Sequence, residues 1–177
     1  ADTTQHVTAR TDLAVIVDGG VGFGDAVHTV RAIRIIEAAG AAGIEIEDQV
    51  APKRVSHHRG IEHLIETREM TDKIDAAVGA RSDPNFVIIA RTGAVRNESF
   101  ENAIERGNAY ADAGADLVVG HGPHVIQAVE VYKGKPLFYS LGNFTFGWEG
   151  INPDWVGLMV WVEIEAKRVV RVSCSPV

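Results

Sequence analysis

Short apolar runs alternate with longer segments of helical periodicity over the first two thirds of the chain. The short runs have the length of strands and lie at residues 13–17, 44–47, 86–90 and 117–119. The segments with apolar residues at helical spacing lie at 27–36, 61–78 and 100–111. Gly40 marks the end of the first helix, and the continuous apolar run at 86–90 is typical of a strand buried on both faces. This order predicts a parallel sheet with right-handed crossovers.

The pattern changes near Gly120, and the rest of the chain is rich in strand-like segments. Residues 129–132 and 137–141 flank a tight turn at 133–135, which predicts a hairpin. A second antiparallel pair is predicted at 158–164 and 169–174, with its turn near 166–167. We therefore expect a single α/β domain over residues 1–177. Its parallel β-α repeats occupy 12–119, and a β-rich segment at 120–177 packs on them.

The composition of the chain argues against some binding partners and cellular locations. Hydrophobic residues make up 46% and charged residues 23% of the 177 residues, as in ordinary globular domains. The net charge of −7 and the lack of a basic stripe argue against nucleic acid as a partner. No apolar run approaches the roughly 20 residues of a membrane span. The polar start of the chain and the single Cys174 predict a cytoplasmic protein.

Charged side chains stand where three of the predicted strands end. Asp18 follows the first strand, Glu47 and Asp48 end the second, and Arg91 follows the third. A simpler interpretation is that the carboxylates cap the following helices or are solvated. The glycines at 19–24 fit a tight strand-to-helix turn better than a phosphate-binding loop, because they match neither G-x-G-x-x-G nor the P-loop pattern.

A series of motifs in matching order and spacing extends this picture. They are VDGGVGFG at 17–24, AAGAAGI at 38–44, EDQVAPKRVSH at 47–57, KIDAA at 73–77, AR at 80–81 and IARTGA at 89–94. Through them, residues 12–116 resemble the isocitrate lyase and phosphoenolpyruvate mutase superfamily. The resemblance implies a (β/α)₈ barrel with its site at the carboxyl ends of the strands. Because the match runs from about the third strand of the family to the sixth, we expect half of a TIM-barrel-like fold, followed by antiparallel hairpins.

The resemblance also implies a Mg²⁺-dependent enzyme that acts on a small 2-oxo or hydroxy carboxylate. Asp18 and Glu47, with Asp48 beside them, would hold Mg²⁺, because a hard cation prefers oxygen ligands. Arg91 would bind a substrate carboxylate through two hydrogen bonds. The remaining implied roles are substrate binding by Gly22 and Gly24, and catalysis on a closing loop by Lys53, Arg54 and His57.

Three positions depart from the pattern of this superfamily. Gly20 stands where a second carboxylate is usual, and Gly93 stands where a carboxylate usually follows Arg-Thr. Val55 replaces the Cys that acts as the acid in the lyase branch, although the mutase branch also lacks that Cys. These departures predict impaired catalysis, and a simpler interpretation of the basic residues near Val55 is an exposed polar loop.

The C-terminal third carries a second set of motifs. They are AGADLVVGHGPHV at 113–125 and VEVYKGKPLFYSLGNF at 129–144. Through them, residues 110–172 resemble the C-terminal part of CapA/PgsA-type proteins of capsule and poly-γ-glutamate synthesis, which have a metallophosphoesterase fold. His121 and His124 would then be metal ligands, with Mn²⁺ as the alternative cofactor. The earlier ligands of such a site have no counterpart here, and the overlap of the two resemblances at 113–116 suggests a chimera.

The sequence is therefore compatible with three functions. They are an impaired Mg²⁺-dependent lyase or mutase, a CapA-like metallophosphoesterase, and a non-catalytic α/β scaffold, whether chimeric or designed. A structural role for His121 and His124 also stays open. Half a barrel would leave sheet edges open, so we expect a homo-oligomer, for example a two-fold dimer whose two half-barrels complete a ring.

Overall fold

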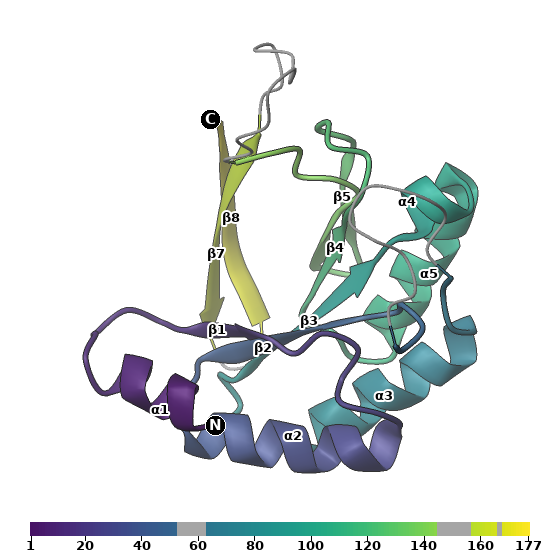
Figure 1. Ribbon diagram of the computed structural model, residues 1–177. Coiled ribbons are helices and arrows are strands. Elements are labelled where there is room, and N and C mark those ends of the chain that lie inside the picture. Colours follow the sequence, from purple (N-terminus) through teal and green to yellow (C-terminus); the bar gives the residue numbers. More distant parts are fainter. Residues whose placement is uncertain (53–62, 145–156, 166–167) are drawn as a thin grey trace.

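The computed structural model describes residues 1–52, 63–144, 157–165 and 168–177. Figure 1 shows a twisted sheet with helices against it and a separate two-stranded hairpin. The helices are α1 (Asp2–Thr8), α2 (Ala26–Ala38), α3 (Thr67–Ala80), α4 (Ala94–Asn97) and α5 (Phe100–Asp112). The strands are β1 (Ile16–Asp18), β2 (Gly43–Glu47), β3 (Val87–Thr92), β4 (Leu117–Gly120), β5 (Val129–Tyr132), β6 (Lys135–Phe138), β7 (Leu158–Glu165) and β8 (Arg168–Pro176).

The larger sheet has six strands in the order β1-β2-β3-β4-β6-β5. β1 to β4 are parallel neighbours, with α2, α3 and α5 in the connections between them, which confirms the predicted α/β class with parallel repeats. β5 and β6 form the predicted hairpin, and β6 pairs in parallel with β4. The hairpin therefore covers one edge of the parallel sheet, whereas β1 lies at the other end of the strand order. β7 and β8 form the second predicted antiparallel pair.

Local sequence signals set the ends of the helices. The Asp25 carboxylate accepts hydrogen bonds from the first turn of α2, and Ser99 does the same for α5. Gly40 follows α2 with a φ of 87°, a left-handed conformation that glycine adopts without strain. The predicted end of the first helix is therefore confirmed. In the part of the chain that the structure describes, every helix is too short or too polar to cross a membrane.

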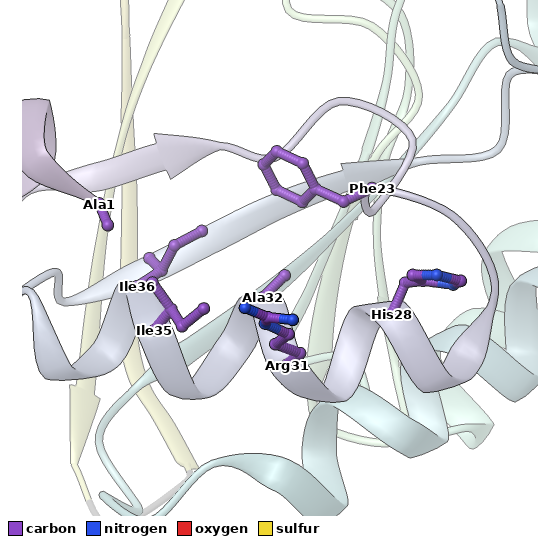
Figure 2. A pocket seen from close by; sticks show the side chains of 7 residues that line it. All are labelled: Ala1, Phe23, His28, Arg31, Ala32, Ile35 and Ile36. Carbon is purple, nitrogen blue, oxygen red and sulfur yellow. The ribbon is translucent and has the colours of Figure 1, made fainter.

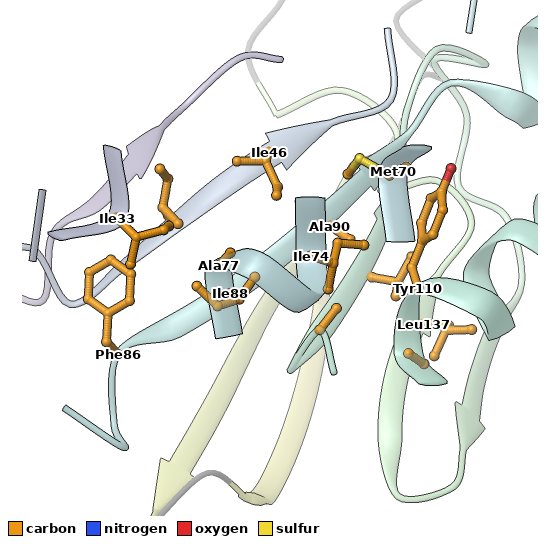
Figure 3. Close-up of a cluster of buried hydrophobic side chains, with 14 of the residues drawn as sticks. Ile33, Ile46, Met70, Ile74, Ala77, Phe86, Ile88, Ala90, Tyr110 and Leu137 are labelled. Atoms are coloured by element: carbon orange, nitrogen blue, oxygen red, sulfur yellow. The ribbon is translucent and has the colours of Figure 1, made fainter. Parts of the chain in front are cut away.

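The core lies between the sheet and its helices. Figure 3 shows Ile33 of α2 and Ile74 of α3 against Ile46, Ile88 and other side chains of the strands. All four are at most 1% exposed, so each stabilises the fold by about 2 kcal/mol relative to an exposed position. The α5 helix adds Tyr110, which is fully buried near the carboxyl ends of β2 and β3.

The prediction that the third strand is buried on both faces is wrong. In β3, Ile88, Ala90 and Thr92 are buried against the helices, while Val87, Ile89 and Arg91 are only half-buried. The described helices pack on one face of the sheet, so a run of apolar residues here does not imply two covered faces. The half-buried face is the one that carries Arg91.

The predicted helix over residues 61–78 is also wrong in its first part. α3 begins only at Thr67, and residues 61–62 lie outside the described chain. Val50 N donates to His63 O at 2.8 Å, and Ile65 N donates to Asp48 O at 2.8 Å. This segment is extended and pairs with the chain after β2. Leu64 and Ile65 still pack on the core, which explains why their positions matched one helical face.

Two glycine-to-alanine changes test this packing with opposite expected signs. A Cβ on Gly120 would lie 2.1 Å from the Tyr139 carbonyl oxygen, so Gly120→Ala should force β4 from its neighbour and lower the unfolding free energy by about 2–3 kcal/mol. Gly79 in α3 has open space around it, so Gly79→Ala should raise that energy by roughly 0.5–1 kcal/mol. Urea denaturation measures both, and equal effects would contradict the packing described here.

Candidate active site

The carboxyl ends of β1, β2 and β3 bring four charged side chains to one face of the sheet. Asp18 is the register partner of Glu45, and Glu47 is the register partner of Arg91. Neighbours in register point to the same face, and so do Glu45 and Glu47, two residues apart in one strand. The structure therefore brings together Asp18, Glu47 and Arg91 of the predicted site. It adds Glu45, which the sequence analysis did not single out.

Arg91 is bound by carboxylates on two sides. Its Nε donates to Glu47 Oε2 at 3.0 Å, its Nη2 donates to the same oxygen, and its Nη1 donates to Glu45 Oε1 at 2.6 Å. The Arg91 and Glu45 side chains are each 22% exposed, and that of Glu47 is 8% exposed. A ligand that approaches this face therefore meets the Glu45 side of the guanidinium more readily than the Glu47 side.

The charges in this group act strongly on one another because Glu45, Glu47 and Arg91 are largely buried. Burial raises the pKa of the Glu45 carboxyl, Arg91 opposes this shift, and the like charges of Asp18 and Glu47 add to it. Burial alone would lower the pKa of Arg91, but Glu45 and Glu47 outweigh it and hold that pKa above its ordinary value. Arg91 is therefore a permanent cation at this edge.

Asp18 opens the glycine-rich loop that joins β1 to α2. Its exposed carboxylate accepts a hydrogen bond from Gly20 N at 2.8 Å. Gly22 and Gly24 have φ values of 81° and 143°, so the predicted substrate-binding glycines form a tight turn whose backbone disfavours other residues. The Lys73 ammonium, on a side chain only 5% exposed, donates to Val21 O at 3.3 Å and holds the loop from α3.

Asp48 leaves β2 on the opposite face and is not placed with Asp18 and Glu47. Its carboxylate is 1% exposed and accepts hydrogen bonds from Thr92 Oγ1 at 2.7 Å, Tyr110 OH at 2.8 Å and Gly93 N at 3.1 Å. Burial raises the pKa of Asp48, and these hydrogen bonds oppose the shift. The predicted metal role of Asp48 gains no support from this geometry. The residue instead connects the ends of β2 and β3 to α5.

Arg106 of α5 extends this buried network. Its Nη1 lies 3.6 Å from Asp48 Oδ2 and donates to Ile65 O at 2.9 Å, while Nη2 donates to Glu98 Oε1 at 2.7 Å. The network thus connects the segment before α3 to the sheet on the face opposite Glu45, Glu47 and Arg91. The roles of Arg106 and Tyr110 could not be predicted from the sequence, because partners this distant along the chain carry no local signal.

The predicted catalytic residues Lys53, Arg54 and His57 lie outside the described residues and stay predictions. The chain on either side of them is described. Val50 N and His63 O are hydrogen-bonded at 2.8 Å just beyond the carboxyl end of β2. The described residues that flank this segment therefore lie close to the carboxyl end of β2, which carries Glu47.

His121 and His124 follow β4 at the same edge. Their ring centroids are 6.0 Å apart, and His124 Nδ1 lies 2.7 Å from Asn143 Oδ1, within hydrogen-bond distance. Over the described ranges, the structure contains no group of three or more His, Cys, Asp or Glu side chains that could hold a metal ion. Mg²⁺, however, usually keeps several waters and uses one or two protein carboxylates, so Asp18 and Glu47 suit it chemically.

An apolar pocket lies beside α2, away from these carboxylates. Figure 2 shows Phe23 reaching over the helix toward Ile35 and Ile36. The lining residues are Ala1, Phe23, His28, Arg31, Ala32, Ile35 and Ile36. Because no carboxylate lines it, this pocket does not fit the predicted Mg²⁺ chemistry.

A parallel β/α sheet with carboxylates and an arginine at the carboxyl ends of its strands has the site arrangement of β/α-barrel enzymes. Comparison with known proteins defines the family. The chain belongs to the phosphoenolpyruvate phosphomutase family, whose profile matches residues 1–134. The match continues beyond Gly120, so it gives no support to a change of family near residues 113–116. The resemblance to the isocitrate lyase and phosphoenolpyruvate mutase superfamily is thereby confirmed.

Several relatives are lyases. The chain is 46% identical over 124 residues to a probable 2-methylisocitrate lyase 1 of Corynebacterium glutamicum, a match that covers 70% of this chain and 40% of the relative. It is 43% identical over 130 residues to 2-methylisocitrate lyase of Salmonella typhimurium, covering 73% of this chain and 43% of the relative. The chain thus spans only about two fifths of these relatives' length.

Solved structures show the same fold. A phosphonopyruvate hydrolase in complex with oxalate and Mg²⁺ matches with a TM-score of 0.62 and 34% identity, over 69% of this chain and 41% of that one. A 2,3-dimethylmalate lyase of the PEP mutase/isocitrate lyase superfamily matches with a TM-score of 0.63 and 31% identity, over 68% and 41%. Both comparisons cover less than half of the solved chain.

Replacing Asp48 tests its structural role. Asp48→Asn should lower the unfolding free energy by about 3 kcal/mol, because the amide cannot accept all three hydrogen bonds and leaves Arg106 with Glu98 as its remaining counter-charge. Asp112→Asn is the matched control, since Asp112 pairs with Lys133 on the surface and should matter little. Urea denaturation compares them. Equal stability of the two variants would contradict the proposal that the Asp48 network stabilises the strand ends that carry the site.

Proposed function

We propose that this protein is a Mg²⁺-dependent enzyme of the lyase or mutase type that acts on a small 2-oxo or hydroxy carboxylate. The observation that carries the proposal is the placement of Asp18, Glu47 and Arg91 on one face at the carboxyl ends of adjacent strands. The names of the relatives, which include 2-methylisocitrate and 2,3-dimethylmalate lyases, support carbon–carbon bond cleavage as the reaction class.

The residues of the proposed site divide into groups with different roles. Asp18 and Glu47 would hold Mg²⁺, directly or through waters, and the bound ion would stabilise negative charge on adjacent substrate oxygens. Arg91 binds a substrate carboxylate and fixes its orientation. The glycine turn with Gly22 and Gly24 brings backbone close to the bound substrate. Proton transfer belongs to the loop with Lys53, Arg54 and His57 in this proposal.

Catalysis by this chain is expected to be slow. Gly20 and Gly93 provide no side chain where the superfamily usually has carboxylates, and Val55 provides no acid. Gly20 also has a φ of 52°, which a side chain would strain. Substrate binding relies on Arg91 and the Asp18–Glu47 pair, so it should survive better than turnover.

A second function is favoured by the pair of histidines. His124 Nδ1 lies 2.7 Å from Asn143 Oδ1, and a hydrogen bond of this kind fixes the orientation of many metal-binding histidines. His121 lies close enough to share an ion with it. Mn²⁺-dependent hydrolysis of p-nitrophenyl phosphate, lost in His124→Ala, would favour a CapA-like phosphoesterase. No activity of either type, with a cooperative thermal melt, would favour a non-catalytic scaffold.

The proposal extends to a cytoplasmic homo-oligomer. β1 ends the strand order of the sheet, and its Ile16 is 46% exposed. A two-fold copy at this edge would cover apolar surface and unpaired backbone groups. Multi-angle light scattering should therefore give at least twice the monomer mass of 19.1 kDa, and Ile16→Lys should reduce it. A monomer at all concentrations would remove the oligomer from the proposal.

Metal titration tests the proposed site. Calorimetry should detect saturable Mg²⁺ binding to the wild-type chain, and Asp18→Asn should weaken it by more than roughly tenfold, a loss that even outer-shell partners can cause. Asp12→Asn removes the same charge from an exposed position before β1 and should bind Mg²⁺ like the wild type.

The outcome also directs the search for a substrate. Binding that depends on Asp18 would justify screening isocitrate-type substrates for release of glyoxylate or pyruvate. Equal binding by the Asp18 and Asp12 variants, or none by the wild type, would contradict the proposed Mg²⁺ site.

A further inference from the structure

The site contains a carboxylate that competes with a substrate for Arg91. Glu47 binds the guanidinium through Nε and Nη2, and Glu45 binds it through Nη1 at 2.6 Å. The Glu45 side chain is more exposed than that of Glu47, 22% against 8%. Nη1 is therefore the position that an incoming carboxylate would use, and Glu45 already fills it.

We propose that Glu45 determines which anions Arg91 accepts, by holding Nη1 until a substrate carboxylate displaces it. This proposal rests on the function proposed above, in which Arg91 binds the substrate. The proposed role of Glu45 is to select among anions, and it takes no part in the reaction itself. It is the register partner of Asp18 and lies on the same face as Glu47, so no change of backbone is needed for it to reach Arg91.

The balance of charge explains what kind of anion succeeds. Among Asp18, Glu45, Glu47 and Arg91, three carboxylates face one guanidinium. A simple monocarboxylate would add a fourth negative charge and gain only the contact that Glu45 gives up. An anion that chelates a divalent cation brings its own counter-charge. Glu45 should therefore exclude simple monocarboxylates and favour substrates with two adjacent oxygen donors, such as 2-oxo and 2-hydroxy acids bound with Mg²⁺.

A substrate carboxylate can replace Glu45 because the ion pair between Glu45 and Arg91 is weakened. Asp18 and Glu47 act on it as like charges, which weakens its ion pair with Arg91. Its partial exposure also allows solvent to receive the displaced carboxylate. Glu47 differs in this respect, since it binds two guanidinium nitrogens and is nearly buried.

The test measures oxalate and acetate binding by calorimetry, each with and without Mg²⁺. Glu45→Gln should bind oxalate with Mg²⁺ about five- to tenfold more tightly than the wild type, because a partly exposed ion pair no longer competes. It should also gain acetate binding without Mg²⁺, and this gain should vanish in the double variant Glu45→Gln/Arg91→Lys. Glu163→Gln removes a carboxylate from an exposed pair with Arg171 on the separate hairpin and should behave like the wild type.

The outcomes separate this proposal from the proposed function. If the wild type binds oxalate with Mg²⁺ and Glu45→Gln binds it no better, the role of Glu45 is wrong and the function stands. If neither binds oxalate, the proposed function fails, and acetate binding by Glu45→Gln still decides whether Glu45 blocks Arg91. Should Glu45→Gln not fold, Glu45→Asp tests the contact with Nη1 alone, since its shorter side chain retains the charge but withdraws from Nη1; tighter binding of oxalate with Mg²⁺ than by the wild type is then the expected result.

Discussion

Side chains leave the end of β2 on alternate faces, and the rest of the site depends on this alternation. Glu47 points to the open face and binds Arg91, whereas the next residue, Asp48, points to the helices and binds Thr92 and Tyr110. The ends of β2 and β3 are thus joined by an ion pair on one face of the sheet and by a hydrogen-bonded network on the face that the helices cover. In the proposed function, Glu45 exchanges with a substrate carboxylate on this face while the buried network keeps the strand ends in place.

The fold could be predicted from the sequence where a pattern is local. The second, third and fourth strand runs, the helix ending at Gly40 and both hairpins follow from spacing and turn residues alone. The first run, 13–17, overlaps β1 only at residues 16–17, and Leu13 is exposed. The spacing of apolar residues did not predict the element correctly where two neighbouring elements pack on the same core. Leu64 and Ile65 match the periodicity of α3 but belong to an extended segment paired with residues 48–50. Whether 86–90 was covered on one face or two depended on the chain around it, which no single run encodes.

The candidate site could be predicted in part for the same reason. Asp18, Glu47 and Arg91 were found because strand ends in a parallel sheet converge at one edge. Asp48 was grouped with them by adjacency, although a period of two places it on the other face. That same period was the available signal for Glu45, two residues before Glu47. Arg106 and Tyr110 reach Asp48 from about 60 residues away, so only the folded chain reveals them.

The central claim is that one face of this sheet binds a metal-chelating carboxylate through Arg91. A crystal structure of the chain with Mg²⁺ and oxalate tests it most directly. The account predicts the ion beside Asp18 and Glu47, the oxalate on Arg91 and the Glu45 carboxylate turned away from Nη1. Mg²⁺ found instead at His121 and His124, or Arg91 still bound to both glutamates with no oxalate near it, would contradict the account.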